Sequence, residues 1–285
     1  MDQPNINKRK FGRTGIDVTC VGLGGEGILR TFGQEKAAQM VINEAIHQGI
    51  SYFDSANAYA GSEGYYGLVW PKQPDIRAKI FQASKSAQRN RSSAMKDLDN
   101  TLSTMGVNHI DLWQIHDVRS HQEIDVIASP GGALEAFLAA KSTGKIRFLG
   151  VTGHHDPEVL TRAVRELPVD AVMMPVNPVE AALGGFLDST LPAAIKKGVA
   201  VIGMKVLGAS QYLSPQAGVT AQSLIRFALS YPISVAIVGC SSPQHVQVLA
   251  DAGSVSEPLS EQERSSLTEI FQPYARRLAY YRGVL

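Results

Sequence analysis

The chain has 285 residues, of which 44% are hydrophobic and 19% are charged, so it can bury a sizeable core. Its 27 Lys and Arg residues nearly balance its 26 Asp and Glu residues, which argues against a nucleic-acid-binding surface or an acidic tail. The two cysteines, Cys20 and Cys240, are too few for a disulfide framework, and no apolar run approaches the roughly 18 residues of a membrane span.

The predicted elements begin with a hairpin, because residues 6–18 carry the turn sequence RTG between two short apolar pieces. Short apolar runs then alternate with segments of helical period. The runs predicted to be strands are residues 19–25, 51–54, 80–85, 110–116, 146–152, 170–176, 199–205 and 235–239. The predicted helices are residues 34–49, 92–106, 131–145, 156–167, 188–198, 220–230 and 242–253, and a further helix and tail follow from residue 259.

This alternation predicts the fold class. Eight nearly continuous apolar strands separated by helices indicate parallel strands that are covered on both faces. Eight such units in about 250 residues favour a closed (β/α)8 barrel, the TIM barrel, over an open sheet. We therefore expect one α/β domain over residues 1–285, with the N-terminal hairpin covering the lower end of the barrel and an extra helix at the C-terminus.

Polar residues end three successive predicted strands. Asp54, Lys85 and His116 follow one another at intervals of 31 residues, which is about the length of one strand–helix unit of a barrel. The carboxyl ends of all barrel strands meet on one face, so these side chains should converge there. Tyr59, five residues after Asp54, should lie beside them.

These four residues predict a site that donates a proton. A free phenol has a pKa of about 10, and a nearby ammonium such as Lys85 should lower the pKa of Tyr59. Asp54 can hold Lys85 in place, and His116 can donate a hydrogen bond to a substrate oxygen. Such a pocket suits a carbonyl whose oxygen becomes negative as a hydride arrives. Taken singly, each residue has a structural reading, because Asp54 can cap the backbone and His116 can be a core histidine.

At these motifs the sequence resembles the aldo-keto reductase superfamily, in a bacterial-type branch, over nearly the whole chain. The matching segments are FGRTGIDVTCVGLGG (11–25), YFDSANAYAGSE (52–63), QASK (82–85), DLWQIH (111–116), GKIRFLGVTGHH (144–155), VIGMKVLGASQ (201–211) and IVGCSSPQHV (237–246). The resemblance implies a nicotinamide-dependent reductase of aldehydes or ketones, or the reverse reaction. It also implies a catalytic tetrad of Asp54, Tyr59, Lys85 and His116, with Tyr59 as the general acid.

The resemblance further implies NADP(H) as the cofactor, with NAD(H) as an alternative. The cofactor-binding residues that it implies are Gly25, Asp54, Thr152, Gly153, Met173, Met204, Lys205, Leu207, Gly239, Ser241 and His245. Several depart from the family pattern. Thr152-Gly153 occupies the position where the family commonly has Ser-Asn. Met173 replaces a Gln, and Met204 replaces an aromatic residue. Gly239 and His245 replace the Lys and Arg that clamp the 2′-phosphate, so the preference for NADPH over NADH should be weak.

The substrate walls are expected on four loops, residues 26–32, 65–71, 117–132 and 208–218, where Phe32, Tyr66 and Trp70 would suit an apolar carbonyl compound. Arg30 and Arg119 on these loops are the candidates for contact with an anionic group, although each can equally be solvated.

Two other functions remain open at this point. The histidines and acids at 116–121 and 154–156 could suggest a metal-dependent hydrolase, but adjacent histidines point apart in an extended chain and Lys85 would repel a metal. A redox-sensing subunit that binds the cofactor with little turnover is the second. We expect no metal ion, and a small carbonyl or alcohol as the binding partner rather than nucleic acid or membrane. With no signal peptide visible, a cytoplasmic location is expected, while the oligomeric state stays open.

Overall fold

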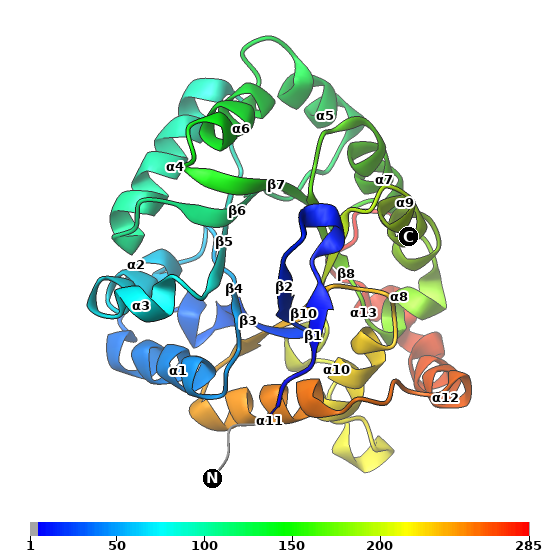
Figure 1. Cartoon of the computed structure of the whole chain (residues 1–285). Coiled ribbons are helices and arrows are strands. Elements are labelled where there is room, and N and C mark those ends of the chain that lie inside the picture. The colour runs from blue at the N-terminus through cyan, green and yellow to red at the C-terminus, as the bar shows by residue number, and fades with distance from the viewer. Residues whose placement is uncertain (1–4, 285) are drawn as a thin grey trace.

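The computed structural model describes residues 5–284, in which eight parallel strands form a closed barrel (Figure 1). In chain order the barrel strands are β3 (Val21–Gly27), β4 (Tyr52–Phe53), β5 (Phe81–Ser86), β6 (Ile110–Ile115), β7 (Ile146–Thr152), β8 (Ala171–Pro175), β9 (Ala200–Met204) and β10 (Val235–Cys240). Each strand pairs with the next, and β10 closes the ring by pairing with β3. The predicted (β/α)8 barrel is therefore confirmed. Residues 1–4 and 285, which the single-domain and signal-peptide expectations include, lie outside the described residues.

Helices surround the barrel (Figure 1). They are α1 (Glu35–His47), α2 (Ser62–Gly67), α3 (Pro74–Arg77), α4 (Arg91–Met105), α5 (His121–Ala128), α6 (Ala133–Ser142), α7 (Pro157–Glu166), α8 (Pro178–Leu183), α9 (Leu191–Lys196), α10 (Ala221–Leu229), α11 (Pro243–Ser254), α12 (Glu261–Phe271) and α13 (Ala275–Leu278). The extra C-terminal helix is thus present as α12 and α13. After α13, the chain passes the end of β7, where the Gly283 N–H donates to the carbonyl of His155.

The strands are buried on both faces, and their side chains alternate between two cores. Leu112 of β6 packs inside the barrel, whereas Trp113 points outward and stacks on Phe137 of α6 with ring centroids 3.7 Å apart. Tyr52 and Ala83 also belong to the inner core. The inward-facing positions of the same strands continue at Asp54, Lys85 and His116. Alternation alone therefore points these side chains toward the barrel axis, above the apolar inner core.

The N-terminal hairpin plugs the lower end of the barrel, as predicted (Figure 1). Its strands β1 (Lys8–Lys10) and β2 (Asp17–Thr19) pair antiparallel. Phe11 at the turn is fully buried and contacts Phe81 of the inner core, with ring centroids 4.7 Å apart. The first barrel strand begins at Val21, later than predicted, because Thr19 belongs to the hairpin.

The loops at 65–71 and 117–132 contain helices that the sequence did not predict, α2 and α5. Tyr66 and Trp70 are 0% and 1% exposed and stack on each other against Phe53 of the outer core. Trp70 donates a hydrogen bond of 3.0 Å to Gln82. The expectation that these two aromatics line a substrate pocket is therefore wrong.

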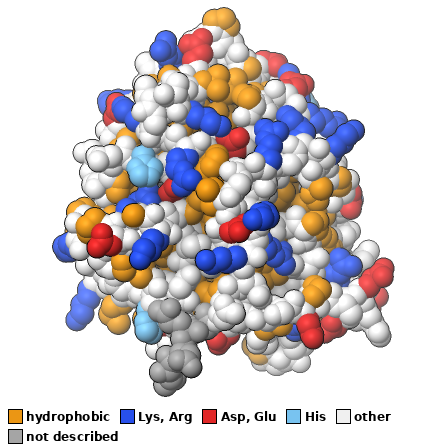
Figure 2. All heavy atoms as spheres, in the orientation of Figure 1, with side chains coloured by type: hydrophobic (Ala, Val, Ile, Leu, Met, Phe, Trp, Pro, Cys, Tyr) orange, Lys and Arg blue, Asp and Glu red, His pale blue; other side chains and the backbone are white. Residues whose placement is uncertain are grey.

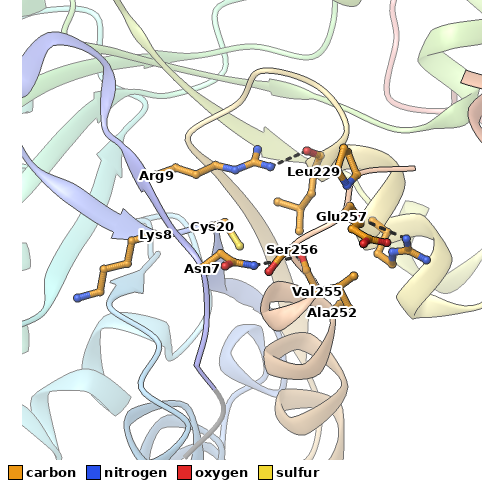
Figure 3. Close-up of a pocket in the computed structure, with 11 residues that line it drawn as sticks. Asn7, Lys8, Arg9, Cys20, Leu229, Ala252, Val255, Ser256 and Glu257 are labelled. Carbon is orange, nitrogen blue, oxygen red and sulfur yellow. Dashed lines mark hydrogen bonds between the residues drawn. The ribbon is translucent and has the colours of Figure 1, made fainter. Parts of the chain in front are cut away.

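The face around the hairpin carries Lys, Arg, Asp and Glu side chains interspersed with small apolar patches (Figure 2). A small cavity of about 120 Å³ lies beside the hairpin, lined by Arg9, Cys20 and Leu229 among others (Figure 3). The Arg9 guanidinium donates to the carbonyls of Leu229, at 2.7 Å, and Ile233, at 3.0 Å, which fastens the hairpin to the end of α10. Within residues 5–284, no helix is long and apolar enough to cross a membrane.

Candidate active site

A buried ion pair forms the floor of the site. Lys85, at the end of β5, donates from Nζ to Asp54 Oδ2 at 2.6 Å and to the carbonyl of Ser55 at 2.7 Å. Both side chains are at most 2% exposed. Burial raises the pKa of Asp54 and lowers the pKa of Lys85, while the attraction between the two charges acts in the opposite direction. Removing both charges from water is therefore unfavourable, and removing only one partner would be far more destabilising because the other charge would stay buried without a partner.

Tyr59 lies directly above this pair, in the loop between β4 and α2. Its ring centroid is 4.7 Å from Lys85 Nζ and 4.8 Å from Arg30 Cζ, and it meets the His116 ring edge-on at 5.8 Å. The ring rests against strand β3 at Gly25, where an added β-carbon would stand 2.7 Å from Tyr59 Cδ2. The missing side chain at Gly25 thus makes room for Tyr59.

The pKa of Tyr59 moves in the direction opposite to the prediction. Burial raises it well above the usual value of a phenol, and the carboxylates of Asp54 and Glu26 raise it further, while Arg30 opposes them. The expected net lowering of this pKa is therefore wrong for this structure, because loss of hydration and the nearby carboxylates outweigh the opposing charge of Arg30. Tyr59 therefore holds its proton across the ordinary pH range.

His116 follows β6 and is neutral. Burial, and next the charge of Lys85, lower its pKa to about 3. A neutral imidazole has one N–H donor and one acceptor, so His116 can donate a hydrogen bond to an oxygen but carries no charge to stabilise it.

A carboxylate–imidazole pair, which the sequence did not predict, lies next to His116. Asp117 has φ of +55° and binds Arg119 through Oδ2 at 2.6 Å, with His154 Nε2 3.4 Å from its other oxygen. His154 Nδ1 lies 3.1 Å from the carbonyl of Tyr281 in the returning C-terminal segment. The only sequence signal was the presence of titratable residues directly after two strands.

A cleft of about 550 Å³ opens beside Asp54 and Tyr59, and this volume is within the usual range for a small-molecule site. Lys85 and His116 are not among its described lining residues. The expected cofactor residues that line it are Gly25, Asp54, Met173, Met204, Lys205, Leu207, Gly239, Ser241 and His245. Thr152 and Gly153 are not among the described lining residues. Thr152 is 1% exposed and its hydroxyl accepts a hydrogen bond of 2.8 Å from the Asp117 N–H. Gly153 packs against Leu160 of α7.

Asn177, after β8, is fully engaged inside the protein. Its Oδ1 caps α8 by accepting from the Glu180 N–H at 3.0 Å. Its Nδ2 donates to the Lys205 carbonyl and to Tyr281 Oη, both at 3.1 Å. These bonds use the amide that could otherwise have faced a ligand.

The far end of the cleft is formed by the turn between β10 and α11. Ser242 caps α11 by accepting from the His245 N–H at 3.4 Å, and the Ser241 N–H lies 3.3 Å from His245 Nδ1. Among the described residues that line the cleft, the Lys and Arg side chains are Arg30 and Lys205, and neither belongs to this turn. Within residues 5–284, no group of three His, Cys, Asp or Glu side chains is close enough together to hold a metal ion.

Comparison with known proteins places this arrangement in context. A sequence model described as the aldo/keto reductase family matches residues 20–218. L-galactose dehydrogenase of Arabidopsis thaliana is 28% identical over 214 residues, covering 69% of this chain and 64% of that protein. The 6-dehydroglucose reductase of Novosphingobium aromaticivorans is 25% identical over 225 residues, covering 73% and 71%. The chain thus spans less than two thirds of the length of the first relative.

Solved structures agree on the fold. An aldo-keto reductase from Bacillus halodurans in its holo form superposes with a TM-score of 0.76 at 19% identity, covering 93% of this chain and 96% of that chain. A thermostable aldo-keto reductase in complex with the inhibitor epalrestat also reaches 0.76, at 23% identity, covering 93% of this chain and 100% of that chain. At such identities the likeness concerns the barrel itself.

Proposed function

Since the chain belongs to the aldo/keto reductase family, we propose that it is a nicotinamide-dependent oxidoreductase that reduces an aldehyde or ketone to an alcohol, or catalyses the reverse oxidation. The observation that carries this proposal is the buried Lys85–Asp54 pair, 2.6 Å apart, beneath the Tyr59 ring at the floor of an open cleft. A phenol above a fixed ammonium is suited to proton transfer to a carbonyl oxygen.

Tyr59 acts as the general acid in this proposal. Its raised pKa keeps the phenol protonated before reaction. As the proton moves to the substrate oxygen, negative charge develops on the phenol, and the Lys85 ammonium is already in place to stabilise that charge. Asp54 keeps Lys85 charged and oriented. His116, neutral because its pKa is about 3, donates a hydrogen bond to the same substrate oxygen and orients the carbonyl.

The cleft supports an extended dinucleotide. When bound, the nicotinamide cofactor supplies or accepts the hydride at the substrate carbon. Met173 and Met204 offer polarizable side chains to a flat ring at the tetrad end. Ser241 and the start of α11 offer a hydroxyl and a helix N-terminus to a phosphate at the far end.

Cofactor preference should be weak, because the described lining residues at the β10–α11 turn include His245 but no Lys or Arg. Two cationic contacts to the 2′-phosphate would be worth more than about a hundredfold in affinity. We therefore expect Michaelis constants for NADPH and NADH that differ by less than this factor. A larger preference for NADPH would refute the claim that the 2′-phosphate is bound weakly. It would leave the proposed reductase activity unaffected.

The proposal is tested by direct binding and by turnover. NADPH and NADH are titrated against protein fluorescence, and a carbonyl panel is then assayed with both cofactors. The panel includes hydroxyaldehydes, because two relatives have names derived from sugars. We expect dinucleotide binding and reduction of at least one carbonyl class. Tight binding with no turnover across the panel would favour a redox-sensing subunit, and no binding of either dinucleotide would refute the proposal.

A further inference from the structure

Lys205 has an unfavourable backbone conformation. It directly follows strand β9 and has φ of +56°, in the left-handed region that penalises residues with a β-carbon. Glycine would adopt this conformation without strain. Strained residues of this kind persist where the surrounding structure holds them, and they gather at functional sites.

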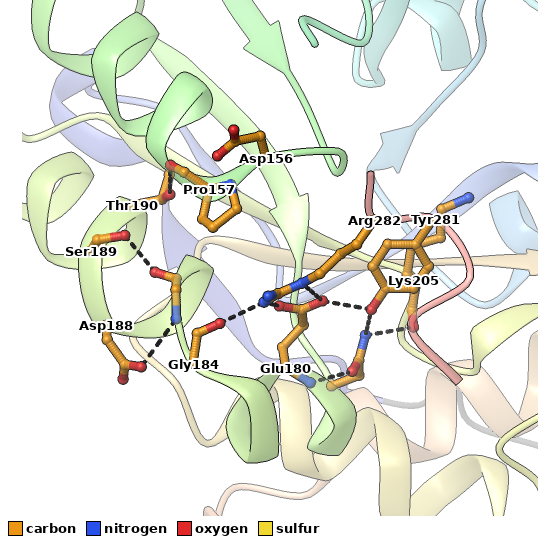
Figure 4. Close-up of polar contacts among 12 residues, drawn as sticks. Asp156, Pro157, Glu180, Gly184, Asp188, Ser189, Thr190, Lys205, Tyr281 and Arg282 are labelled. Carbon is orange, nitrogen blue, oxygen red and sulfur yellow. Dashed lines mark hydrogen bonds and ion pairs between the residues drawn. The ribbon is translucent and has the colours of Figure 1, made fainter. Parts of the chain in front are cut away.

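Buried hydrogen bonds hold this strained position. The Lys205 carbonyl accepts from Asn177 Nδ2, and the same amide donates to Tyr281 Oη. Tyr281 Oη in turn donates to Glu180 at 2.8 Å, and Glu180 forms an ion pair with Arg282 (Figure 4). These bonds connect the C-terminal segment to the turn that carries Lys205. They therefore fix the direction in which the Lys205 side chain leaves the backbone.

No contact of the Lys205 side chain within the described residues offsets the strain of its backbone. Within residues 5–284, no hydrogen bond and no ion pair within 4.0 Å joins its ammonium to another residue. The charge that stabilises it most is that of Glu26, which is itself paired with Arg30. It is half-buried in the wall of the cleft, and burial lowers its pKa. A partly dehydrated cation without a partner is unfavourable unless something else supplies the opposite charge.

The charged side chains around Tyr59 show how much negative charge a ligand must bring to neutralise the cleft. Asp54 balances Lys85, and Glu26 balances Arg30 at 2.6 Å, which leaves the ammonium of Lys205 as the excess charge of the cleft. The charges of Glu26 and Arg30 act on Lys205 most strongly, and those of Asp117 and Lys85 act on it more weakly, so Lys205 lies on the side of the cleft where Arg30 approaches Tyr59. A ligand with one anionic group close to its reacting carbon would complete the balance.

We propose that Lys205, together with Arg30, binds an anionic group carried by the carbonyl substrate, so that the preferred substrates are oxo acids or phosphorylated carbonyl compounds. This inference rests on the proposed reductase function and adds the class of substrate. It assigns Lys205 to the substrate, whereas the family resemblance implies that Lys205 binds the cofactor. The Arg30 guanidinium, although paired with Glu26, lines the same cleft 4.8 Å from the Tyr59 ring centroid and can supply further hydrogen-bond donors. The other source of the same chemistry is the diphosphate of the cofactor, which the experiment must separate from a substrate anion.

The test compares each charged aldehyde acid with an uncharged ester of the same chain length. The probes are glyoxylate, succinic semialdehyde and adipic semialdehyde, each paired with its methyl ester, and the measured quantity is the ratio of kcat/KM for acid and ester. We expect the protein to prefer the acid for at least one chain length, and Lys205→Met to lower that ratio by at least about tenfold. Lys205→Arg should retain most of the preference. Lys36→Met, at an exposed position on α1, serves as the control for net charge and should leave the ratio unchanged.

Dinucleotide affinity separates the two anion sources. The dissociation constants of NADPH and NADH, measured by fluorescence quenching, should change by less than about threefold in Lys205→Met. Weakening of both by more than tenfold, with acid and ester affected equally, would assign the ammonium to the diphosphate and overturn the inference. Turnover of the esters with no preference for the acids would overturn it while the proposed function stands. Absence of turnover with every aldehyde would refute the proposed function itself.

Discussion

Gly25 provides the sharpest test of how Tyr59 is positioned. In Gly25→Ala, the new β-carbon would stand 2.7 Å from Cδ2 and 2.9 Å from Cε2 of Tyr59, and 3.0 Å from the carbonyl oxygen of Asp54. Carbon atoms in contact are normally about 3.5–4.0 Å apart, so the ring must move by about 1 Å. The backbone of β3 cannot give way as easily, because it is paired with β4 and β10.

Such a displacement acts mainly on catalysis. A shift of about 1 Å in a reacting group can lower a rate by about a hundredfold, so kcat of Gly25→Ala should fall by about that factor. The free energy of unfolding should fall by no more than about 1–3 kcal/mol, the range for overpacking, because the ring faces an open cleft and can move. The assay is kcat at saturating dinucleotide and carbonyl, combined with urea unfolding.

Gly64→Ala is the matched control. Gly64 lies in α2, and nothing is within 4 Å of a β-carbon built there. Alanine at this helical position should raise the free energy of unfolding by about 0.5–1 kcal/mol and leave kcat unchanged. If Gly25→Ala kept kcat within about threefold of the wild type, the ring would not depend on the bare backbone at position 25, and the reasoning would be refuted.

Three further predictions follow from the site and its surroundings. Because the pKa of His116 is about 3, rate profiles should show no break from this residue between about pH 5 and 8. The free energy of unfolding should rise with pH between about 3 and 6.5, since the unfolded chain binds a proton there that the folded chain does not. In His116→Asn, this rise, measured by urea unfolding at several pH values, should be smaller. An unchanged rise would contradict the lowered pKa of His116. Lys85→Met should lower the free energy of unfolding by about 3–5 kcal/mol by leaving Asp54 buried alone, and adding Asp54→Leu should restore part of the loss in chemical denaturation, so that additive losses would argue against a coupled pair. Trp70→Phe, which removes the bond to Gln82, should lower the free energy of unfolding by about 1–3 kcal/mol without changing KM, whereas a changed KM would return Trp70 to the substrate wall.

The fold was predictable because its signals are local. Each barrel unit carries its own apolar strand and its own helix, and some of these helices have a capping residue and a stop, such as Asn90 and Gly106 at the two ends of α4. The equal spacing of Asp54, Lys85 and His116 reports one residue per unit at the same strand end, so their convergence follows from barrel topology. The short helices α2 and α5 escaped prediction because six or eight residues carry too little periodicity.

The remaining features depend on packing between distant segments. The Asn177 amide is occupied by Tyr281, 104 residues away, and no local pattern reports that contact. The pKa of Tyr59 depends on how completely the folded chain removes water from the phenol, which residue type and spacing do not reveal. Tyr66 and Trp70 look like loop aromatics in sequence, and only their edge-on contacts with Phe53 identify them as core.

Replacing Tyr59 by Phe tests the central claim most directly, because it removes only the hydroxyl that would carry the proton. General acid catalysis by a positioned side chain is worth about a hundred- to ten-thousandfold, so kcat of Tyr59→Phe for carbonyl reduction should fall by at least a hundredfold. The ring remains to fill the space beside Gly25, so the dissociation constants of NADPH and NADH should stay within about threefold of the wild type. Turnover close to that of the wild type, with dinucleotide binding intact, would contradict the assignment of Tyr59 as the proton donor.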